Sequence, residues 1–538
     1  MIKYKLILFL LVAFLFSFDV DQWTYLKHMG SIHYIVEDDQ LVHFISSNGI
    51  YSYDEIKDSY YYNFNLSHQI DFNSKINHFY FDSNTGMYWL IDQYGIKMKH
   101  SFHDFWSEVS YRRFDIIDTG DIINIGSSPN YIWIKLYHRM IALDPITGLM
   151  IDEDIDYNEI NNINWGNKNE YNYHQDINID LSNYVIFGDW NIRFNKIVND
   201  KEEVLYPTVF FEDANGNIWV GTDKGVILKG SVYSHRLEIV NIGLKFKNIT
   251  MAVLDRNMNW WFGDSQFLRT GIVKNKQNFT NNNLPFLVKW NEYQNDWNYI
   301  NSNASMLIQN TDVNDILSID NIIYIGTMDG LLIFDQLSND WMKIDIDLYD
   351  KAIWDLEYYE GSIYISTARG YNEISSISRQ IIKSKDNLSN MLRNSEIYDI
   401  LVVDNILYVA SEKGLFQKHL DIDSYTLLSD KKFKDIELYE KYIFGSDGDL
   451  WKINLENFKI ENFKPDVLNF SISGNLLWLN HSSYCRLFNI NTNNSWTFDN
   501  RTGIPGSRVY NINSNNEKVW FMTNDGLAIY NWDNSDYE

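Results

Sequence analysis

Hydrophobic and polar residues alternate over short runs along most of this chain, a period typical of half-buried β-strands. The apolar run 323–326 leads into Thr327, then the turn residues 328–330, and then a second apolar run, 331–334. Two such runs joined by a short turn with glycine predict a β-hairpin, because glycine adopts the positive φ that a tight turn requires.

The hairpin pattern repeats along the sequence. Clear copies lie at 213–226, 323–335, 407–416 and 519–530, and weaker ones at 44–51, 88–98, 132–143, 260–273, 363–374, 442–453 and 476–488. A strand before each hairpin and a strand after it, which often contains Trp, give four short strands per unit. Gly330, Gly370 and Gly414 lie 40 and 44 residues apart. A four-stranded unit of about 40 residues predicts one blade of a β-propeller.

A small set of residues defines the repeat motif. A Gly or Ala follows the first hairpin strand, where side-chain bulk is excluded, and a Thr or Ser hydroxyl near the turn is expected to satisfy backbone groups. The motif residues are Trp219, Gly221, Thr222, Gly225, Gly326, Thr327, Gly330, Gly414, Trp520, Thr523 and Gly526.

The number of units predicts an all-β fold of tandem β-propellers, with about 11 or 12 four-stranded blades in two rings. One ring would exceed the usual range of about four to eight blades. The Asn-rich segment 275–300 is the expected break, which gives an N-terminal propeller over 19–305, with an irregular insertion near 151–205, and a six-bladed C-terminal propeller over 306–538. Trp23 and Tyr25 form an isolated strand pattern, expected to complete a blade begun elsewhere and to close a ring.

The N-terminal residues 1–18 predict a secretory signal peptide. Lys3 and Lys5 precede the apolar run 6–16, which is too short to span a bilayer comfortably. An uncleaved anchor is the alternative. No other long apolar window follows, so we expect an exported protein, periplasmic or at the cell surface, that is not integral to a membrane after cleavage. Cys485 is the single cysteine, so no disulfide framework is expected, and this residue is assigned to the core.

Charge and composition exclude several classes of protein. The chain has 45 Lys and Arg against 72 Asp and Glu, a formal net charge of −27. Nucleic-acid binding is excluded because it relies on positive charge that displaces counterions. Hydrophobic residues at 45% and aromatic residues at 16% exclude a disordered chain.

The candidate ligand-binding residues are Trp106, Trp260 and Trp261. They fall outside the regular Trp positions of the repeat, so they are the expected members of an exposed platform for a sugar ring. The Trp residues at repeat positions, such as Trp219 and Trp520, are expected in the core instead.

No metal, cofactor or catalytic residue is assigned. Residues 213–217 begin like a calcium loop but lack the bidentate Glu, so a turn is expected. The acidic run 152–156 is predicted to be solvated. His100 and His103 have no further ligand at a known metal-site spacing. The motifs of nucleotide-binding loops, serine hydrolases and zinc peptidases are missing from the sequence.

Residues 213–226 resemble the two-component-regulator propeller repeat, Asp-x-x-Gly-x-hydrophobic-Trp-hydrophobic-Gly-Thr-x-x-Gly-hydrophobic. Residues 323–331 and 519–527 match its second half, and the other copies diverge. The resemblance implies a propeller of the kind found in extracytoplasmic sensor halves of hybrid histidine kinases, which bind oligosaccharide, or in stand-alone exported propellers, which include a type IX secretion component. The sequence ends at Glu538 directly after the last hairpin, so signalling by this chain alone is not expected.

The sequence therefore favours an exported, non-catalytic binding or scaffold protein that recognises a glycan, a peptide or an envelope partner. Two alternatives stay open. A propeller glycosidase or lyase that acts on polysaccharide would require clustered carboxylates, or Tyr, His and Arg groups, with perturbed pKa values at one channel mouth. A component of a secretion apparatus such as type IX would instead be found with envelope machinery.

Overall fold

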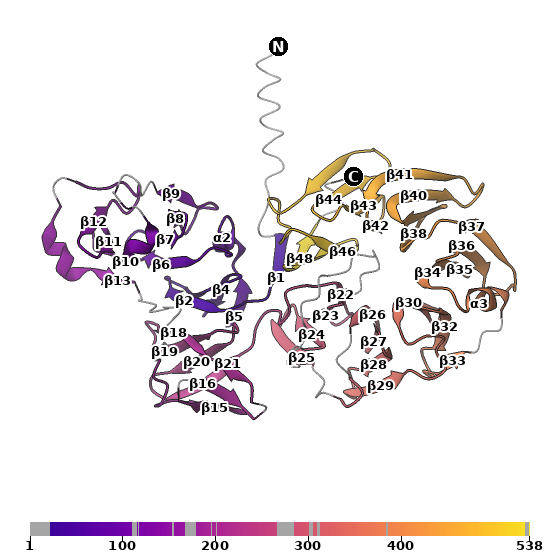
Figure 1. The fold of residues 1–538 in the computed structure, drawn as a ribbon, viewed down its shortest axis with the longest axis horizontal. Coiled ribbons are helices and arrows are strands. Elements are labelled where there is room, and N and C mark those ends of the chain that lie inside the picture. Colours follow the sequence, from indigo (N-terminus) through magenta and orange to yellow (C-terminus); the bar gives the residue numbers. More distant parts are fainter. Residues whose placement is uncertain are drawn as a thin grey trace, which may run out of the picture. The chain divides into compact units, whose positions relative to one another are not determined.

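The computed structural model describes residues 22–109, 114, 116, 118–152, 155–166, 179–194, 196–200, 202–265, 285–300, 305–308, 312–382, 386–532 and 537. The expected signal peptide lies outside this set. The described residues are mostly short antiparallel strands, and nearly every sheet has four of them (Figure 1). The predicted all-β fold of four-stranded blades is confirmed. The contacts divide the chain into a middle unit, Lys27–Gly243, and a C-terminal unit, Leu244–Glu538 together with the segment that ends at Leu26.

Seven four-stranded sheets make up the described C-terminal unit, and we number them blades 1 to 7. Blade 1 is β22 (Met251–Leu254), β23 (Asn259–Gly263), β24 (Leu287–Asn291) and β25 (Asp296–Ile300); blade 2 is β26 (Val313–Ile319), β27 (Ile322–Thr327), β28 (Gly330–Asp335) and β29 (Asp340–Ile344); blade 3 is β30 (Ile353–Tyr359), β31 (Ser362–Thr367), β32 (Gly370–Ser375) and β33 (Ile381–Ile382); blade 4, which follows the helix α3 (Asn387–Leu392), is β34 (Ile397–Val403), β35 (Ile406–Ser411), β36 (Gly414–His419) and β37 (Tyr425–Ser429).

Blade 5 is β38 (Asp435–Tyr439), β39 (Tyr442–Ser446), β40 (Gly448–Asn454) and β41 (Ile460–Val467); blade 6 is β42 (Asn469–Ser473), β43 (Leu476–Asn480), β44 (Cys485–Asn489) and β45 (Ser495–Phe498); blade 7 is β46 (Val509–Ser514), β47 (Lys518–Thr523), β48 (Gly526–Asn531) and β1 (Trp23–Leu26). The first strand of each blade packs against the first strand of the next, and Figure 1 shows these strands arranged around a common centre.

The ring closes through two sets of contacts. The N-terminal strand β1 pairs antiparallel with β48, so the chain's first described strand completes its last blade. Blade 7 then packs on blade 1: the Trp520 indole donates a hydrogen bond of 2.9 Å to the Ala252 carbonyl oxygen and lies edge-on to Trp260. The expectation that Trp23 and Tyr25 complete a distant blade is confirmed, because β1 pairs along the outer edge of β48.

The boundary between the units differs from the predicted break at 305/306. The sheet β22–β25 packs with blade 2 through a shared core and belongs to the C-terminal unit, which therefore has seven blades rather than six. The physical reason is that blade 1 also supplies the face on which blade 7 closes. The middle unit lies in the sequence between β1 and β22, as an insertion into the larger ring.

The described residues of the middle unit form four blade-like sheets and one smaller sheet. The first two are β2 (Ile32–Glu37), β3 (Leu41–Ser46), β4 (Gly49–Asp54) and β5 (Ser59–Tyr62), then β6 (Ile76–Asp82), β7 (Met87–Asp92), β8 (Ile96–His100) and β9 (Ser107–Val109), with the helix α2 (Phe64–Ser67) between them. The third is β10 (Ile122–Ser127), β11 (Ile132–Leu136), β12 (Met140–Leu143) and β13 (Asn164–Trp165). The fourth is five-stranded: β14 (Val185–Ile186), β18 (Pro207–Glu212), β19 (Asn217–Thr222), β20 (Ile227–Ser231) and β21 (Arg236–Val240).

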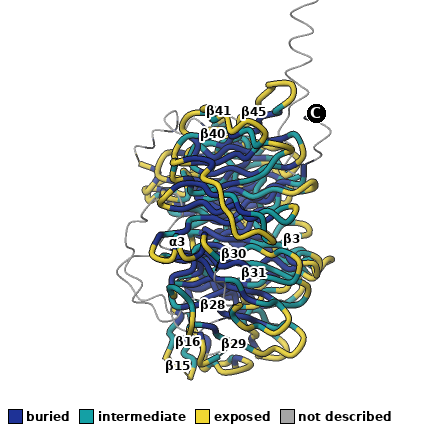
Figure 2. Tube along the Cα trace, turned by 90° about the vertical axis from the view of Figure 1, so that its right-hand side faces the viewer, coloured by how far each residue is buried: buried dark blue, intermediate teal, exposed yellow. Residues whose placement is uncertain are grey.

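The segment 151–205 contributes irregular structure to this unit. Its described residues give the two-residue strands β13 and β14, which extend neighbouring sheets, and the small sheet of β15 (Trp190–Arg193), β16 (Lys196–Asn199) and β17 (Val204–Leu205). That small sheet packs its apolar side on β18–β21. In both units buried residues follow the strands, and exposed residues lie in the turns (Figure 2).

The repeat motif has a clear physical basis in both units. In five copies the hydroxyl at the Thr or Ser position donates to the carbonyl oxygen of the turn glycine three residues later, which fixes the tight turn, whereas Thr222 donates to the Val226 carbonyl oxygen at 2.8 Å. The bonds to glycine are Ser46 to Gly49 at 2.7 Å, Thr327 to Gly330 at 2.7 Å, Thr367 to Gly370 at 2.6 Å, Ser411 to Gly414 at 2.9 Å and Thr523 to Gly526 at 2.8 Å. Gly330 has φ +110°, a conformation that side chains disfavour.

We expect Gly326→Ala to lower the free energy of unfolding by about 1–3 kcal/mol. A Cβ at Gly326 would lie 2.7 Å from Ile353 Cγ2, on the first strand of the next blade. Urea unfolding of the full chain measures the effect. Ser366→Ala is the matched control, because Ser366 holds the corresponding place on β31 and already carries a Cβ there. Equal stability of Gly326→Ala and the parent would contradict the crowding argument.

Candidate functional site

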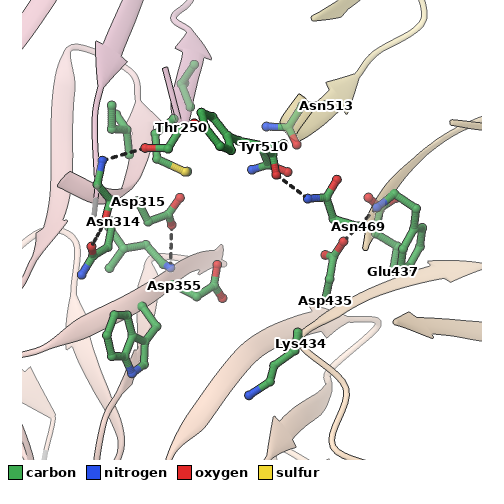
Figure 3. A pocket seen from close by; sticks show the side chains of 18 residues that line it. Thr250, Asn314, Asp315, Asp355, Lys434, Asp435, Glu437, Asn469, Tyr510 and Asn513 are labelled. Atoms are coloured by element: carbon green, nitrogen blue, oxygen red, sulfur yellow. Dashed lines mark hydrogen bonds between the residues drawn. The ribbon is translucent and has the colours of Figure 1, made fainter. Parts of the chain in front are cut away.

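A cavity of about 200 Å³ lies among the first strands of the C-terminal ring. We call it the channel cavity. Its polar wall comes from six of the seven blades, mostly from the beginnings of their first strands: Thr250, Ser265, Asn314, Asp315, Trp354, Asp355, Lys434, Asp435, Glu437, Asn469, Tyr510 and Asn513. Figure 3 shows Asp315 and Asp355 on one side of this space, with Asp435, Asn469 and Asn513 on the other.

The aspartates of the ring are hydrogen-bonded from blade to blade. Each sits near the start of a first strand, and one carboxylate oxygen accepts the backbone N–H of the next first strand, whose inner edge has no strand partner. The bonds are Leu356 N to Asp315 at 2.8 Å, Ile400 N to Asp355 at 3.1 Å, Ile436 N to Asp399 at 2.7 Å and Phe470 N to Asp435 at 3.1 Å. We call this set the aspartate ladder. It satisfies buried donors that the open inner edges would otherwise leave unpaired.

A second pair of acids continues the pattern two residues further along. Glu357 accepts from Val402 N at 3.3 Å, and Glu437 accepts from Ile472 N at 2.8 Å. Burial, followed by the charge of Asp355, raises the pKa of Glu357 to about 8. Burial, followed by the charge of the neighbouring aspartate, also raises the pKa of Glu437 well above its usual range. Glu357 is therefore mostly protonated at neutral pH.

The protein should lose stability between about pH 4.5 and pH 8 because of Glu357. In this window the unfolded chain releases the Glu357 proton while the folded chain retains it, so the unfolded state binds fewer protons and unfolding is favoured as pH rises. Below pH 4.5 both states are protonated and the contribution is constant. Thermal unfolding from pH 5 to 8 should show a smaller fall for Glu357→Gln than for the parent; parallel curves would contradict the raised pKa.

Few polar groups of the channel cavity are available for a ligand. Asn469 Nδ2 donates to the Tyr510 carbonyl oxygen at 2.7 Å, and Asn314 Nδ2 donates to the Ile353 carbonyl oxygen at 2.7 Å, so both amides join blades. Asn513 differs, because its side chain has no hydrogen bond to any described residue and lies at the cavity wall in Figure 3. The cavity is thus a rigid polar space with one uncommitted amide.

The predicted Trp platform is wrong. Trp260 and Trp261 are fully buried in β23, and Trp106 is 8% exposed in a core cluster of the middle unit. Each indole N–H is bonded internally, Trp260 to Glu292 at 3.1 Å, Trp261 to Asp255 at 2.9 Å and Trp106 to the Leu66 carbonyl oxygen at 3.1 Å. The structure does not bring the three together on an exposed surface.

The sequence does carry a signal for the burial of Trp261. Asp255, Asn259 and Trp261 have the same spacing as Asp213, Asn217 and Trp219, and in both cases the aspartate accepts the indole N–H. In the copy that contains Trp261, Met258 with φ +59° takes the place that Gly216 has in the copy that contains Trp219. The repeat is therefore harder to recognise in the sequence.

The remaining candidates behave as local structure. Asp213 accepts the backbone N–H groups of Asn215 and Asn217 at 3.0 and 2.8 Å, which makes the predicted turn. Cys485 is buried, and burial raises the pKa of its thiol. His100 and His103 have ring centroids 5.4 Å apart. Of the acidic run 152–156, residues 153 and 154 lie outside the described set. Across the described ranges, no three His, Cys, Asp or Glu residues are grouped so as to hold a metal ion.

Comparison with known proteins finds similarity only at the level of structure. No family model matches the sequence, so the resemblance of 213–226 to the propeller repeat stays a prediction, and no curated protein matches either. The extracellular domain of the BT4673 one-component system of B. thetaiotaomicron is 12% identical, with 95% of this chain and 83% of that chain covered and a TM-score of 0.44.

Two further solved structures are similar. PorZ, a bacterial surface component of the type-IX secretion system of Porphyromonas gingivalis, is 9% identical, with 95% and 87% covered and a TM-score of 0.47. The extracellular domain of the BT3049 hybrid two-component system of B. thetaiotaomicron is 14% identical, with 96% and 84% covered and a TM-score of 0.32. These similarities are too distant to carry function to this chain. In the described part of the chain, no helix combines the length and apolarity needed to cross a bilayer.

Proposed function

We propose that this protein is an exported, non-catalytic propeller that binds a polar group of a glycan, a peptide or an envelope partner in the channel cavity. The observation that supports this proposal is the aspartate ladder: the acids that face the channel accept backbone hydrogen bonds between blades and so act as framework. The basic N-terminal residues Lys3 and Lys5, before an apolar run, support export.

The volume and chemistry of the cavity favour a small neutral group with hydroxyl or amide functions. About 200 Å³ is below the roughly 300–1,000 Å³ of a drug-sized ligand site, so one sugar ring or one side chain fits better than a long polymer. The raised pKa of Glu437 favours its protonated form, which can donate a hydrogen bond, and Asn513 can both donate and accept.

A glycan array followed by titration calorimetry tests this proposal. We expect the Asn513→Ala variant to lose at least tenfold in affinity for the best array ligand, because a site that hydrogen-bonds its ligand leaves a polar group unpaired when one partner is removed. Asn298→Ala, on the exposed face of β25, is the matched control and should bind normally. Equal affinity of Asn513→Ala and the parent would move the binding site elsewhere.

A polysaccharide hydrolase is the second candidate, because burial raises the pKa of Glu437, which lies two residues from Asp435 on the same strand, and acid–base glycoside cleavage uses a pair of carboxyl groups. The same samples discriminate the two. Release of new reducing ends from a bound glycan, abolished in Glu437→Gln, would favour the hydrolase; binding without release favours the non-catalytic role. Co-purification with envelope machinery would instead favour the secretion-apparatus alternative.

A further inference from the structure

A second, larger cavity of about 420 Å³ lies between blades 3 and 4, and we call it the interblade cavity. Its wall is formed by side chains on β31 and β32 of blade 3, among them Tyr364 and Tyr371, and by residues of blade 4.

Tyr364 is a buried polar side chain at the wall of the interblade cavity. Its side chain is buried, with 5% of the residue exposed, and it lines the interblade cavity. Its hydroxyl has no hydrogen bond to any described residue. Burial, followed by the charge of Glu373, raises the pKa of the Tyr364 hydroxyl, which places this hydroxyl within the field of that carboxylate. Tyr364 and Glu373 are direct cross-strand neighbours.

The charge of the interblade cavity is unbalanced. Four carboxylates line it, from Glu360, Glu373, Asp386 and Asp421, against the single ammonium group of Lys418. Lys418 Nζ is already paired with Asp386 at 3.1 Å. Glu373 accepts the Ser362 hydroxyl at 2.6 Å and has no ion pair among the described residues. A partly buried carboxylate without a cation is costly unless a ligand supplies the charge.

We propose that the interblade cavity binds an organic cation, an ammonium or guanidinium group on an aliphatic stem, which pairs with Glu373 and donates a hydrogen bond to the Tyr364 hydroxyl. Tyrosine rings and carboxylates together favour such cations. An anion would meet uncompensated carboxylates, and a metal ion lacks a grouped set of three ligands in the described residues. The site is separate from the channel cavity and does not depend on the proposed function.

Titration calorimetry with the full chain and two probes tests the proposal. Butylguanidinium represents a free small cation, and acetyl-Gly-Gly-Arg-Gly-Gly-amide represents the basic side chain of a partner protein. Binding of either probe supports the site, and the tighter of the two identifies the source of the cation. Pentanamide, a neutral molecule of similar length, is the ligand control and should not bind. Raising NaCl should weaken binding because part of the attraction is ionic.

The variants make the test specific to this site. Glu373→Gln keeps the shape and removes the charge, and should lower affinity at least tenfold; Tyr364→Phe should lower it several-fold. Glu461→Gln, on β41 away from the cavity, and Asn513→Ala, in the channel cavity, should bind both probes normally. Unchanged circular dichroism melting curves show that the variants fold. Absence of binding by both probes, equal binding of pentanamide, or full affinity of folded Glu373→Gln would overturn the proposal.

Discussion

Replacing Trp23 by alanine is expected to lower the free energy of unfolding of the C-terminal unit by about 3–5 kcal/mol, the usual effect of removing a buried aromatic side chain. Trp23 is 8% exposed, and its ring stacks on Tyr530 at 4.6 Å and on Phe521 at 5.8 Å between centroids. Without the Trp23 ring, β1 loses its main aromatic contacts with β47 and β48. If β1 then dissociates, the last blade keeps three strands and β48 becomes its edge strand.

Hydrogen exchange read by mass spectrometry measures this loss unit by unit. In Trp23→Ala the amides of β48 should exchange faster, while those of the middle unit should keep their protection. Trp190→Ala is the matched control, because β15 belongs to the small sheet of the middle unit and its loss should leave β48 unchanged. Full protection of β48 in Trp23→Ala would show that the blade is stable with three strands, and that β1 is not needed to close the ring.

The blades were predictable from the sequence because each carries its own signals. The alternating apolar residues, the hydroxyl and the turn glycine of one blade all lie within about 40 residues. The hydrogen bond from Thr327 to Gly330, for example, joins residues only three positions apart. The assignment of blades to rings was not predictable in this way. The contacts that place blade 1 in the larger ring join Trp260 to Trp520, which are 260 positions apart in the sequence.

The channel cavity illustrates a different limit of sequence analysis. The sequence shows Asp315, Asp355 and Asp399 as acids within apolar strands. Their hydrogen-bond partners are backbone N–H groups of the following blade, and these cannot be predicted from residue types because every residue except proline has one. The same holds for the interblade cavity, whose wall joins residues of blades 3 and 4 that lie far apart in the sequence. The irregular positions of Trp106, Trp260 and Trp261 predicted an exposed platform, but their indole N–H groups bond internally and the three side chains are buried.

The aspartate ladder leads to the second large expected effect: Asp399→Ala should destabilise the C-terminal unit by about 3 kcal/mol. Asp399 is 6% exposed, and its two carboxylate oxygens accept Ile436 N at 2.7 Å and Ile400 N at 2.9 Å. Hydrogen bonds to a charged group contribute about 1.5–3 kcal/mol each, and their loss leaves Ile436 N unpaired at the inner edge of blade 5, whereas Ile400 N keeps its bond to Asp355.

Urea unfolding of Asp399→Ala, Asp399→Asn and the exposed control Asp340→Ala separates framework from catalytic roles for these acids. Asn retains an acceptor oxygen without the charge, so Asp399→Asn should lose less than Asp399→Ala, and Asp340→Ala should stay within about 0.5 kcal/mol of the parent. A carboxylate with a catalytic role typically lowers the free energy of unfolding, so replacing it would leave the protein as stable as the parent or more stable. Such a result at Asp399 would contradict the framework role of the ladder and strengthen the hydrolase alternative for the acids in the channel cavity.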